Sequence, residues 1–187
     1  MWGIKPNCPT VFVLGIILGI ALCEAYYILF SPTILAEGSV EVVTDREYFD
    51  DALQALQGAR ESIHMVMFSL NRYTAPEHMN SQVNQLITEV LKAKNKGVDV
   101  KIIMDDWPEG NEKSKGFFEE NDIEVRVDEE FEGTTHDKLI IIDGKIVIVG
   151  STNWSFFSVE KNHEANVIIF DERIARKFEE YFSSLWN

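Results

Sequence analysis

The sequence is poor in cysteine and in basic residues, and both shortages limit what the protein can be. Its 187 residues contain 2 cysteines, Cys8 and Cys23, which both lie near the N-terminus. A disulfide framework and a Cys/His zinc site are therefore excluded for the rest of the chain. Lysine and arginine number 17 against 31 aspartate and glutamate residues, so the formal net charge is −14. The chain thus lacks the overall basic character that is typical of nucleic-acid-binding proteins.

A local excess of negative charge points the same way. The run Asp128-Glu129-Glu130-Phe131-Glu132 directly precedes the most informative segment of the chain. It is either a solvated loop that points elsewhere or a group of charges that repels a polyanion from the site. Net charge affects solubility and association rates more than chemistry, so neither reading excludes cleavage of a phosphodiester.

The most informative pattern occurs once, and no second copy is found. It reads His136-x-Lys138, four residues, Asp143, six residues, and Gly150-Ser151-x-Asn153. The pattern supplies a histidine nucleophile, a lysine charge for phosphate, and hydroxyl and amide groups beside them. These are the groups that cleavage of a phosphodiester requires.

Strand periodicity predicts how these residues come together. Side chains alternate along an extended run, so His136 and Lys138 share one face. Asp143-Gly144 lies between two apolar β-branched runs, which predicts a hairpin with a two-residue loop. With that loop, His136 lies opposite Ser151, and Asn153 is the diagonal neighbour on the same face. The hairpin therefore gathers the motif at one end, and Asp143 points away from it.

The pattern resembles the HKD motif of the phospholipase D superfamily, and the likeness is closest to small single-motif, endonuclease-like members of bacterial or archaeal type. The likeness extends over roughly residues 40–187, and it includes residues 62–69, 74–76, 97–102 and Asn162-His163-Glu164. It implies an α/β fold with a mixed β-sheet and helices on both faces.

The resemblance also implies a reaction through a covalent phosphohistidine, with no metal or other cofactor. His136 attacks phosphorus, and Glu164 matches the acid that orients and polarises the histidine. The implied catalytic residues are His136, Lys138, Asp143 and Glu164, and the implied phosphate-binding residues are Lys138, Ser151 and Asn153. Asp143 is interpreted as a turn residue that supports the others.

One motif per chain supplies half of this chemistry, because one histidine cannot be neutral nucleophile and protonated acid at once. The simple solution is a twofold homodimer in which two motifs face each other. The first expected substrate is DNA or RNA, and the alternative is membrane phospholipid. A third hypothesis is an inactive dimeric scaffold that binds phosphate-containing partners.

The N-terminal segment is apolar over residues 11–30 except for Glu24. Because about 20 apolar residues can cross a bilayer core, we predict a single-pass membrane protein. Residues 1–36 then form a cytoplasmic stub, a transmembrane anchor and a linker, and residues 37–187 form an extracytoplasmic catalytic domain. The alternative is a cleaved secretory signal with Ile34-x-Ala36 as its cleavage site, which leaves a secreted or periplasmic protein.

From residue 40 onward, apolar patterns predict alternating strands and helices, as in an α/β sandwich. Besides the hairpin, strands are expected at 40–43, 63–70, 98–104, 123–127 and 166–170, and helices at about 44–59, 80–96, 112–121 and from 171.

A structural or surface role is expected for His64, His78 and His163. Asp105-Asp106 is interpreted as a strand-end loop beside Trp107 rather than a metal site. Core or interface packing is expected for Trp154, Phe156 and Phe157, with stacking on bases or contact with lipid as alternatives.

Overall fold

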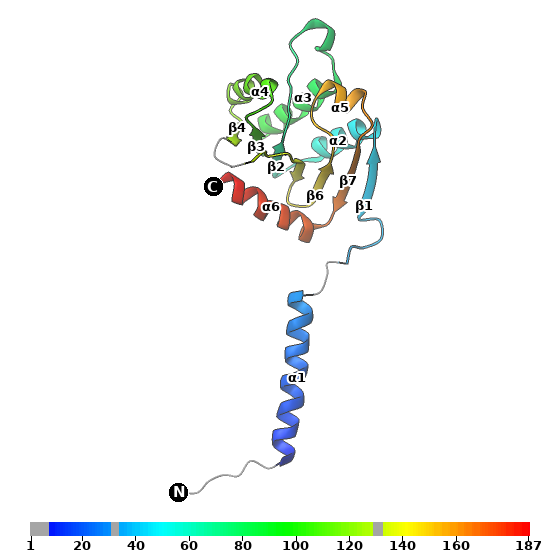
Figure 1. The fold of residues 1–187 in the computed structure, drawn as a ribbon, viewed down its shortest axis with the longest axis vertical. Helices are drawn as coiled ribbons and strands as arrows, with labels where there is room; N and C mark the ends of the chain where they lie inside the picture. Colours follow the sequence, from blue (N-terminus) through cyan, green and yellow to red (C-terminus); the bar gives the residue numbers. More distant parts are fainter. Residues whose placement is uncertain (1–7, 31–33, 129–132) are drawn as a thin grey trace. The chain divides into compact units, whose positions relative to one another are not determined.

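The structure is a computed structural model that describes residues 8–30, 34–128 and 133–187. It divides into two units, Met1–Ala36 and Glu37–Asn187. The first unit holds one helix, α1 (Cys8–Phe30), and the second holds the α/β fold (Figure 1).

The helix α1 does not support the predicted membrane anchor. A bilayer core is crossed by about 20 predominantly apolar residues. Within the described part of the chain, no helix combines the length and the hydropathy needed for that crossing. The side chains of α1 are described continuously over residues 11–26, a stretch that includes Glu24. The prediction of a single-pass membrane protein with an extracytoplasmic catalytic domain is therefore wrong.

The second unit is built on one mixed sheet of seven strands in the order β1-β7-β6-β5-β2-β3-β4. The strands are β1 (Val40–Thr44), β2 (Ser62–Met67), β3 (Asp99–Asp105), β4 (Glu124–Asp128), β5 (Lys138–Ile142), β6 (Ile146–Gly150) and β7 (Ala165–Phe170). The strands β2, β3 and β4 run parallel, and the other neighbouring pairs are antiparallel. The first strand of the unit, β1, thus pairs with its last strand, β7.

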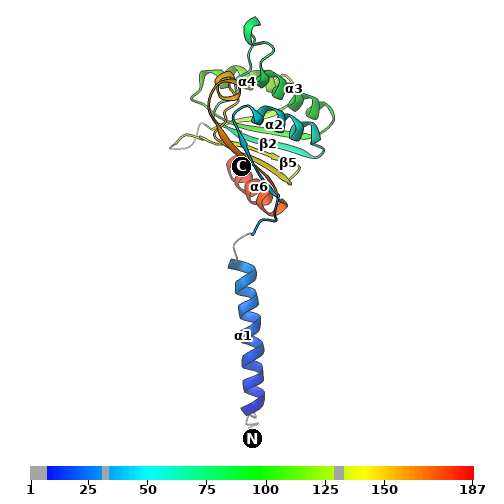
Figure 2. The same cartoon turned by 90° about the vertical axis from the view of Figure 1, so that its right-hand side faces the viewer.

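Helices cover both faces of this sheet, as predicted (Figure 2). They are α2 (Glu47–Gly58), α3 (Gln82–Asn95), α4 (Glu109–Glu119), α5 (Phe156–Glu160) and α6 (Glu172–Trp186), with a 3₁₀ turn η1 (Pro76–His78). The larger core lies between the sheet and α2, α3 and α4. The smaller core lies under α6. Strand alternation divides β5 between them, since Ile140 and Ile142 enter the first core and Leu139 and Ile141 enter the second.

Polar side chains accept backbone amides at the helix starts, and α2 begins later than predicted. Ser81 accepts a hydrogen bond from the Asn84 amide at 3.3 Å, and Asp171 caps α6. At α2, Glu47 accepts a bond from the Thr44 amide at 3.2 Å, as a capping box requires. Asp45, which lies between Thr44 and Glu47, has a positive φ of 49° that is not helical. The helix therefore begins only at Glu47. The short elements α5 and η1 were not predicted, since neither is long enough to show an apolar period.

The register of the β5–β6 hairpin differs from the predicted one by one residue. Ile142 pairs with Ile146, so the loop contains three residues, Asp143-Gly144-Lys145. Asp143 and Gly144 have the positive φ values, 54° and 60°, that the sequence predicts. Lys145 is added to the loop and donates its amide to the Ile142 carbonyl at 2.9 Å. His136 therefore does not lie directly opposite Ser151, because a shift by one residue moves side chains to the other face.

Candidate active site

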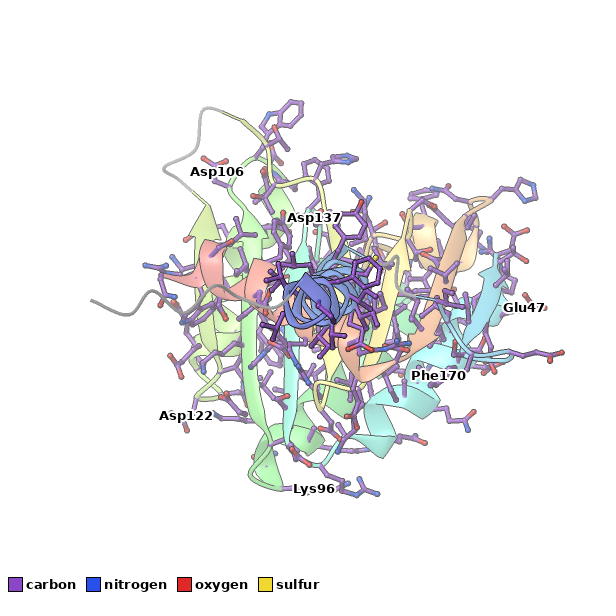
Figure 3. All side chains as sticks on the ribbon, turned by 90° about the horizontal axis from the view of Figure 1, so that it is seen from below. Glu47, Lys96, Asp106, Asp122, Asp137 and Phe170 are labelled. Carbon is purple, nitrogen blue, oxygen red and sulfur yellow. The ribbon has the colours of Figure 1, made fainter. Side chains whose placement is uncertain are left out.

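The motif lies at one end of the sheet, where β3 ends and β5 begins. In Figure 3, Asp106 and Asp137 lie at this end, away from Lys96 and Asp122. Asp137 is held there by two elements. Its carbonyl accepts the Phe68 amide at 2.8 Å, and its carboxylate accepts the Tyr181 hydroxyl at 2.7 Å. The backbone on which His136 stands is thus tied to the end of β2 and to α6.

His136 is exposed and packs against an aromatic ring. Its imidazole lies 4.5 Å from the Phe68 ring, measured between centroids, at an angle of 44°. Phe68 follows β2 directly, so this contact uses a residue of the strand that neighbours β5. The ring contact restricts the imidazole while its outer edge stays open to a substrate.

Lys138 lies beneath His136 and is buried, with 8% of its surface exposed. Its Nζ donates to the His136 carbonyl at 2.7 Å and lies 3.1 Å from His136 Nδ1. The same ammonium lies 4.9 Å from the centroid of the Phe68 ring, a cation–π contact. Burial lowers the pKa of Lys138, and the charges of Asp137 and Glu164 act in the opposite direction. An ammonium has no acceptor, so an imidazole nitrogen is the acceptor in this contact.

Ser151 and Glu164 form the second half of the site. The Ser151 hydroxyl donates to Oε2 of Glu164 and accepts the Ala165 amide at 3.1 Å. The other carboxylate oxygen accepts from the Asn162 side chain at 3.1 Å. Glu164 thus binds Ser151 and Asn162, and its link to the motif lysine is through its charge, which acts on Lys138.

A turn between β1 and α2 supports this acid, and sequence reasoning missed it. Asp45 Oδ1 accepts the Glu164 amide at 2.9 Å, while the Asp45 amide donates to the Glu164 carbonyl at 3.0 Å. Arg46 donates to the carbonyls of Val159 and Asn162. His163 lies 3.0 Å from the second oxygen of Asp45, and hydrogen bonds from His163 and the Glu164 amide lower the pKa of that carboxyl. No local pattern signals this contact, because it joins residues more than 100 positions apart.

Gly150 is required in the motif because β6 and β7 approach closely there. A Cβ atom at this position would lie 2.4 Å from Asn166 Oδ1 and 2.5 Å from the Ala165 carbonyl oxygen. The space is taken by Asn166, whose buried amide binds both the backbone and the hydroxyl of Thr152. Asn166 thus fixes the strand end that carries Ser151, a role that the sequence did not indicate.

Asn153 carries a buried polar atom that lacks a partner among the described residues. Its Oδ1 is enclosed and accepts no hydrogen bond. The neighbouring Trp154 is fully buried, and its indole donates to the Tyr48 hydroxyl at 3.0 Å, so core packing is confirmed for this residue. Phe156 is half-buried and Phe157 is exposed. Because an amide oxygen only accepts hydrogen bonds, the phosphate-binding role predicted for Asn153 requires its side-chain nitrogen, and the unpaired Oδ1 does not support that role.

The structure does not bring Asp143 to the other motif residues. It lies in the hairpin loop at the opposite end of β5 from His136. Its carboxylate accepts the backbone amides of Arg60, Glu61 and Ser62 at 2.7–3.1 Å. Although burial alone would raise its pKa, these hydrogen bonds lower it. Asp143 therefore fixes the entry to β2, as its interpretation as a supporting turn residue requires.

We expect Asp143→Ala to lower stability and leave the chemistry intact. The change leaves three backbone amides without their acceptor, which costs about 1–2 kcal/mol by analogy with lost helix caps. Because the folded pKa lies below the unfolded one, this stabilisation is present above the unfolded pKa and is lost as the pH falls through the folded pKa. Urea unfolding at pH 7 and at pH 3 measures it, and the two proteins should differ less at pH 3. An equal difference at both pH values would contradict this role.

A buried aspartate organises the backbone just before the nucleophile. Asp105 is 2% exposed, and its two oxygens accept the amides of Thr135 at 2.8 Å and Trp107 at 2.9 Å. Asn111, on α4, accepts the Leu70 amide and donates to the carbonyls of Asp105 and Phe68. The predicted strand-end loop at Asp105 is thus confirmed, but its bond to Thr135 was not foreseen.

The other histidines have structural contacts. His64 Nδ1 lies 2.7 Å from Glu179, and His64 Nε2 lies 3.4 Å from Asp99. His78 packs 4.3 Å from the Phe156 ring, measured between centroids.

Within the described residues no group of three His, Cys, Asp or Glu side chains is arranged to hold a metal ion. Residues 129–132 of the acidic run lie outside the described residues, so both readings of that run stay predictions.

The sequence matches known proteins over most of the second unit. Residues 52–186 match the family described as "Cardiolipin synthase, PLD-like domain". The chain is 33% identical over 136 residues to the mitochondrial cardiolipin hydrolase of Canis lupus familiaris, covering 72% of this chain and 49% of that protein. It is 30% identical over 127 residues to the phospholipase D of Rickettsia typhi, covering 67% and 56%. The chain therefore spans about half the length of these curated relatives.

Solved structures match the fold more completely. Nuc from Salmonella typhimurium, described as a phospholipase D family member, is 30% identical with a TM-score of 0.67. The match covers 80% of this chain and 94% of Nuc. NucT from Helicobacter pylori, at 20% identity, has a TM-score of 0.66 and supports the fold alone.

Proposed function

The chain belongs to the phospholipase D superfamily, and from this membership we propose that it is a phosphodiesterase-type hydrolase, namely a metal-independent nuclease that cleaves DNA or RNA. The observation that supports this proposal most is the contact between a buried ammonium and an exposed imidazole, with Lys138 Nζ 3.1 Å from His136 Nδ1. This pair offers a nucleophile and a positive charge to the same phosphate.

In the first step, the neutral imidazole of His136 attacks phosphorus and the bond to the leaving oxygen breaks. The leaving oxygen takes the electron pair and a proton from His136 of a second subunit, which acts as general acid. Lys138 offsets the charge on the non-bridging oxygens, the side-chain nitrogen of Asn153 donates a further hydrogen bond, and Ser151 supports the site through its bond to Glu164.

In the second step, water attacks the phosphohistidine while His136 of the second subunit takes its proton. The nitrogen–phosphorus bond breaks, and the first imidazole regains its electron pair. Both histidines then return to their starting states. Because two identical imidazoles share this cycle, the pH–rate profile is bell-shaped, and its apparent pKa values belong to the pair.

The preference for nucleic acid is supported by the extent of the match to Nuc. The chain covers 94% of Nuc but 49% of the canine cardiolipin hydrolase. The second candidate, hydrolysis of membrane phospholipid, is favoured by the names of the curated relatives, which include cardiolipin hydrolase and phospholipase D.

One experiment separates the two candidates. The purified protein is incubated in excess chelator with single-stranded DNA, single-stranded RNA, cardiolipin vesicles and phosphatidylcholine vesicles. The proposal expects cleavage of a nucleic acid that persists in chelator and is lost in His136→Ala. Turnover of lipid with no cleavage of either nucleic acid would establish the second candidate instead, and activity on none of the four would favour a phosphate-binding scaffold.

We further expect a heterodimer of one wild-type and one His136→Ala subunit to be inactive. Each product requires a nucleophile from one subunit and an acid from the other, and a missing general acid costs about 10²–10⁴-fold. The two chains are co-expressed with different affinity tags, and the heterodimer is isolated over both columns. Its turnover is compared with that of a doubly tagged wild-type dimer. A heterodimer with half the wild-type rate, or a fully active monomer in sedimentation, would contradict a shared site.

A further inference from the structure

Among the described residues of the second unit, Trp107 is the most exposed large apolar side chain, and it follows a strand that ends near the motif. Trp107 follows β3 directly, and 76% of its surface is exposed. No other large apolar side chain described in residues 37–187 is more exposed. An exposed indole gives up the free energy of burial, so its retention at this place calls for an explanation other than packing.

The backbone under this ring is fixed rather than loose. The Trp107 amide donates to Asp105 at 2.9 Å. Two residues later α4 begins, and its buried Asn111 binds the Asp105 carbonyl at 2.8 Å and the Pro108 carbonyl at 2.9 Å. These hydrogen bonds fix the backbone turn, and the indole that it carries is exposed to solvent. An exposed ring on a fixed backbone loses little conformational entropy when a planar ligand stacks on it.

Ring contacts connect this indole to the nucleophile. The Trp107 and Phe68 rings meet edge to face, with centroids 6.4 Å apart. The Phe68 ring also contacts the His136 ring, with centroids 4.5 Å apart. The carboxylate of Asp105 bonds both loops, through Trp107 and through Thr135 next to His136. One buried side chain thus joins the backbone at the indole to the backbone next to His136.

We propose that Trp107 binds substrate by stacking on the nucleobase next to the scissile phosphate. This inference rests on the proposed nuclease function and assigns to that site a substrate class, a single-stranded nucleic acid with an unpaired base. Every base offers a π-face, so such a contact tolerates any sequence. Stacking requires no positive charge, so this contact contributes to binding of a polyanion despite the formal net charge of −14.

The expected effect is a loss of binding rather than of chemistry. Removing a stacking aromatic costs about 5- to 150-fold per base, which here lowers kcat/KM mainly through KM. Trp107→Ala should show the full loss, and Trp107→Phe should recover most of it because a smaller ring still stacks. The matched control is Phe170→Ala, which removes an exposed aromatic ring at the end of β7 away from Glu164. It should cleave at the wild-type rate, and thermal unfolding should confirm that each variant is folded.

The decisive test compares oligonucleotides that differ in one base. Each carries one cleavable phosphodiester, and the nucleotide on its 5′ or 3′ side is either intact or abasic. Wild-type protein should lose the same factor on one of the abasic substrates as Trp107→Ala loses on the intact one. Trp107→Ala should show no further loss on that abasic substrate, since the contact is already gone.

The outcomes distinguish this inference from the function on which it rests. Equal losses for Trp107→Ala on intact and abasic substrates, or no loss on either, would overturn base stacking while the nuclease function stands. A loss confined to hydrolysis of phospholipid vesicles would assign the indole to a lipid surface and overturn the inference. If wild-type protein cleaves no oligonucleotide, the nuclease proposal itself fails and base stacking fails with it.

Discussion

His136→Ala is expected to reduce phosphodiester cleavage by at least about 10³-fold, the largest effect of any single substitution in the chain. Under the proposed function the variant removes the atom that attacks phosphorus, and the described contacts of that ring, Phe68 and Lys138, supply no second imidazole. Because the imidazole is exposed, its removal should leave the fold intact. Single-turnover rates on a labelled oligonucleotide measure the effect.

Two further measurements make this expectation specific. The control is His64→Gln, since His64 bonds Glu179 and Asp99 away from the motif, and it should keep the wild-type rate. Wild-type protein quenched during turnover should carry the label on histidine, and His136→Ala should not. Retention of the wild-type rate by His136→Ala or His136→Asn would remove the nucleophile assignment.

Lys138→Met is expected to lower kcat by about 10²–10³-fold, the range found for loss of one preorganised donor to a developing charge. Methionine nearly matches the length of the lysine stem, and the site is buried, so the fold should tolerate it. The ammonium contacts the His136 carbonyl and ring, and its loss removes the charge nearest to the reacting phosphorus.

The same lysine should limit activity at alkaline pH. Burial lowers the pKa of Lys138, so the ammonium loses its proton at lower pH than an exposed lysine does. The rate of the wild-type protein should fall on the alkaline side through that pKa. A Lys138→Arg variant, which stays charged, should lack this fall and keep, at a lower rate, only the alkaline limb that the histidine pair gives. An unchanged kcat in Lys138→Met would exclude a role for its charge.

Sequence patterns predicted the layers of the fold well and the pairing of the motif less well. The apolar periods gave every strand and the four long helices of the second unit, because those periods report directly on burial. The hairpin register was wrong because Asp143-Gly144 predicts the positive φ values but not whether Lys145 joins the loop. That single residue decides which side chains lie across from the motif.

The supporting residues of the site were beyond prediction for a different reason. Asp45 and Asp105 are ordinary acidic residues in the sequence, and each acts through backbone amides far along the chain. Only the order of strands in the sheet shows that they meet Glu164 and Thr135. The prediction of a membrane anchor at the N-terminus failed because it rested on apolar composition alone. The described helix does not support such an anchor.

The pairing of β1 with β7 has a consequence for how the protein is made. Asp45 leaves the ribosome early, but the acid that it holds, Glu164, is synthesised more than 100 residues later. A growing chain therefore carries His136 and Lys138 before the other half of the site exists. The candidate site of the nascent polypeptide therefore remains incomplete until its final strand pairs with β1 and closes the sheet.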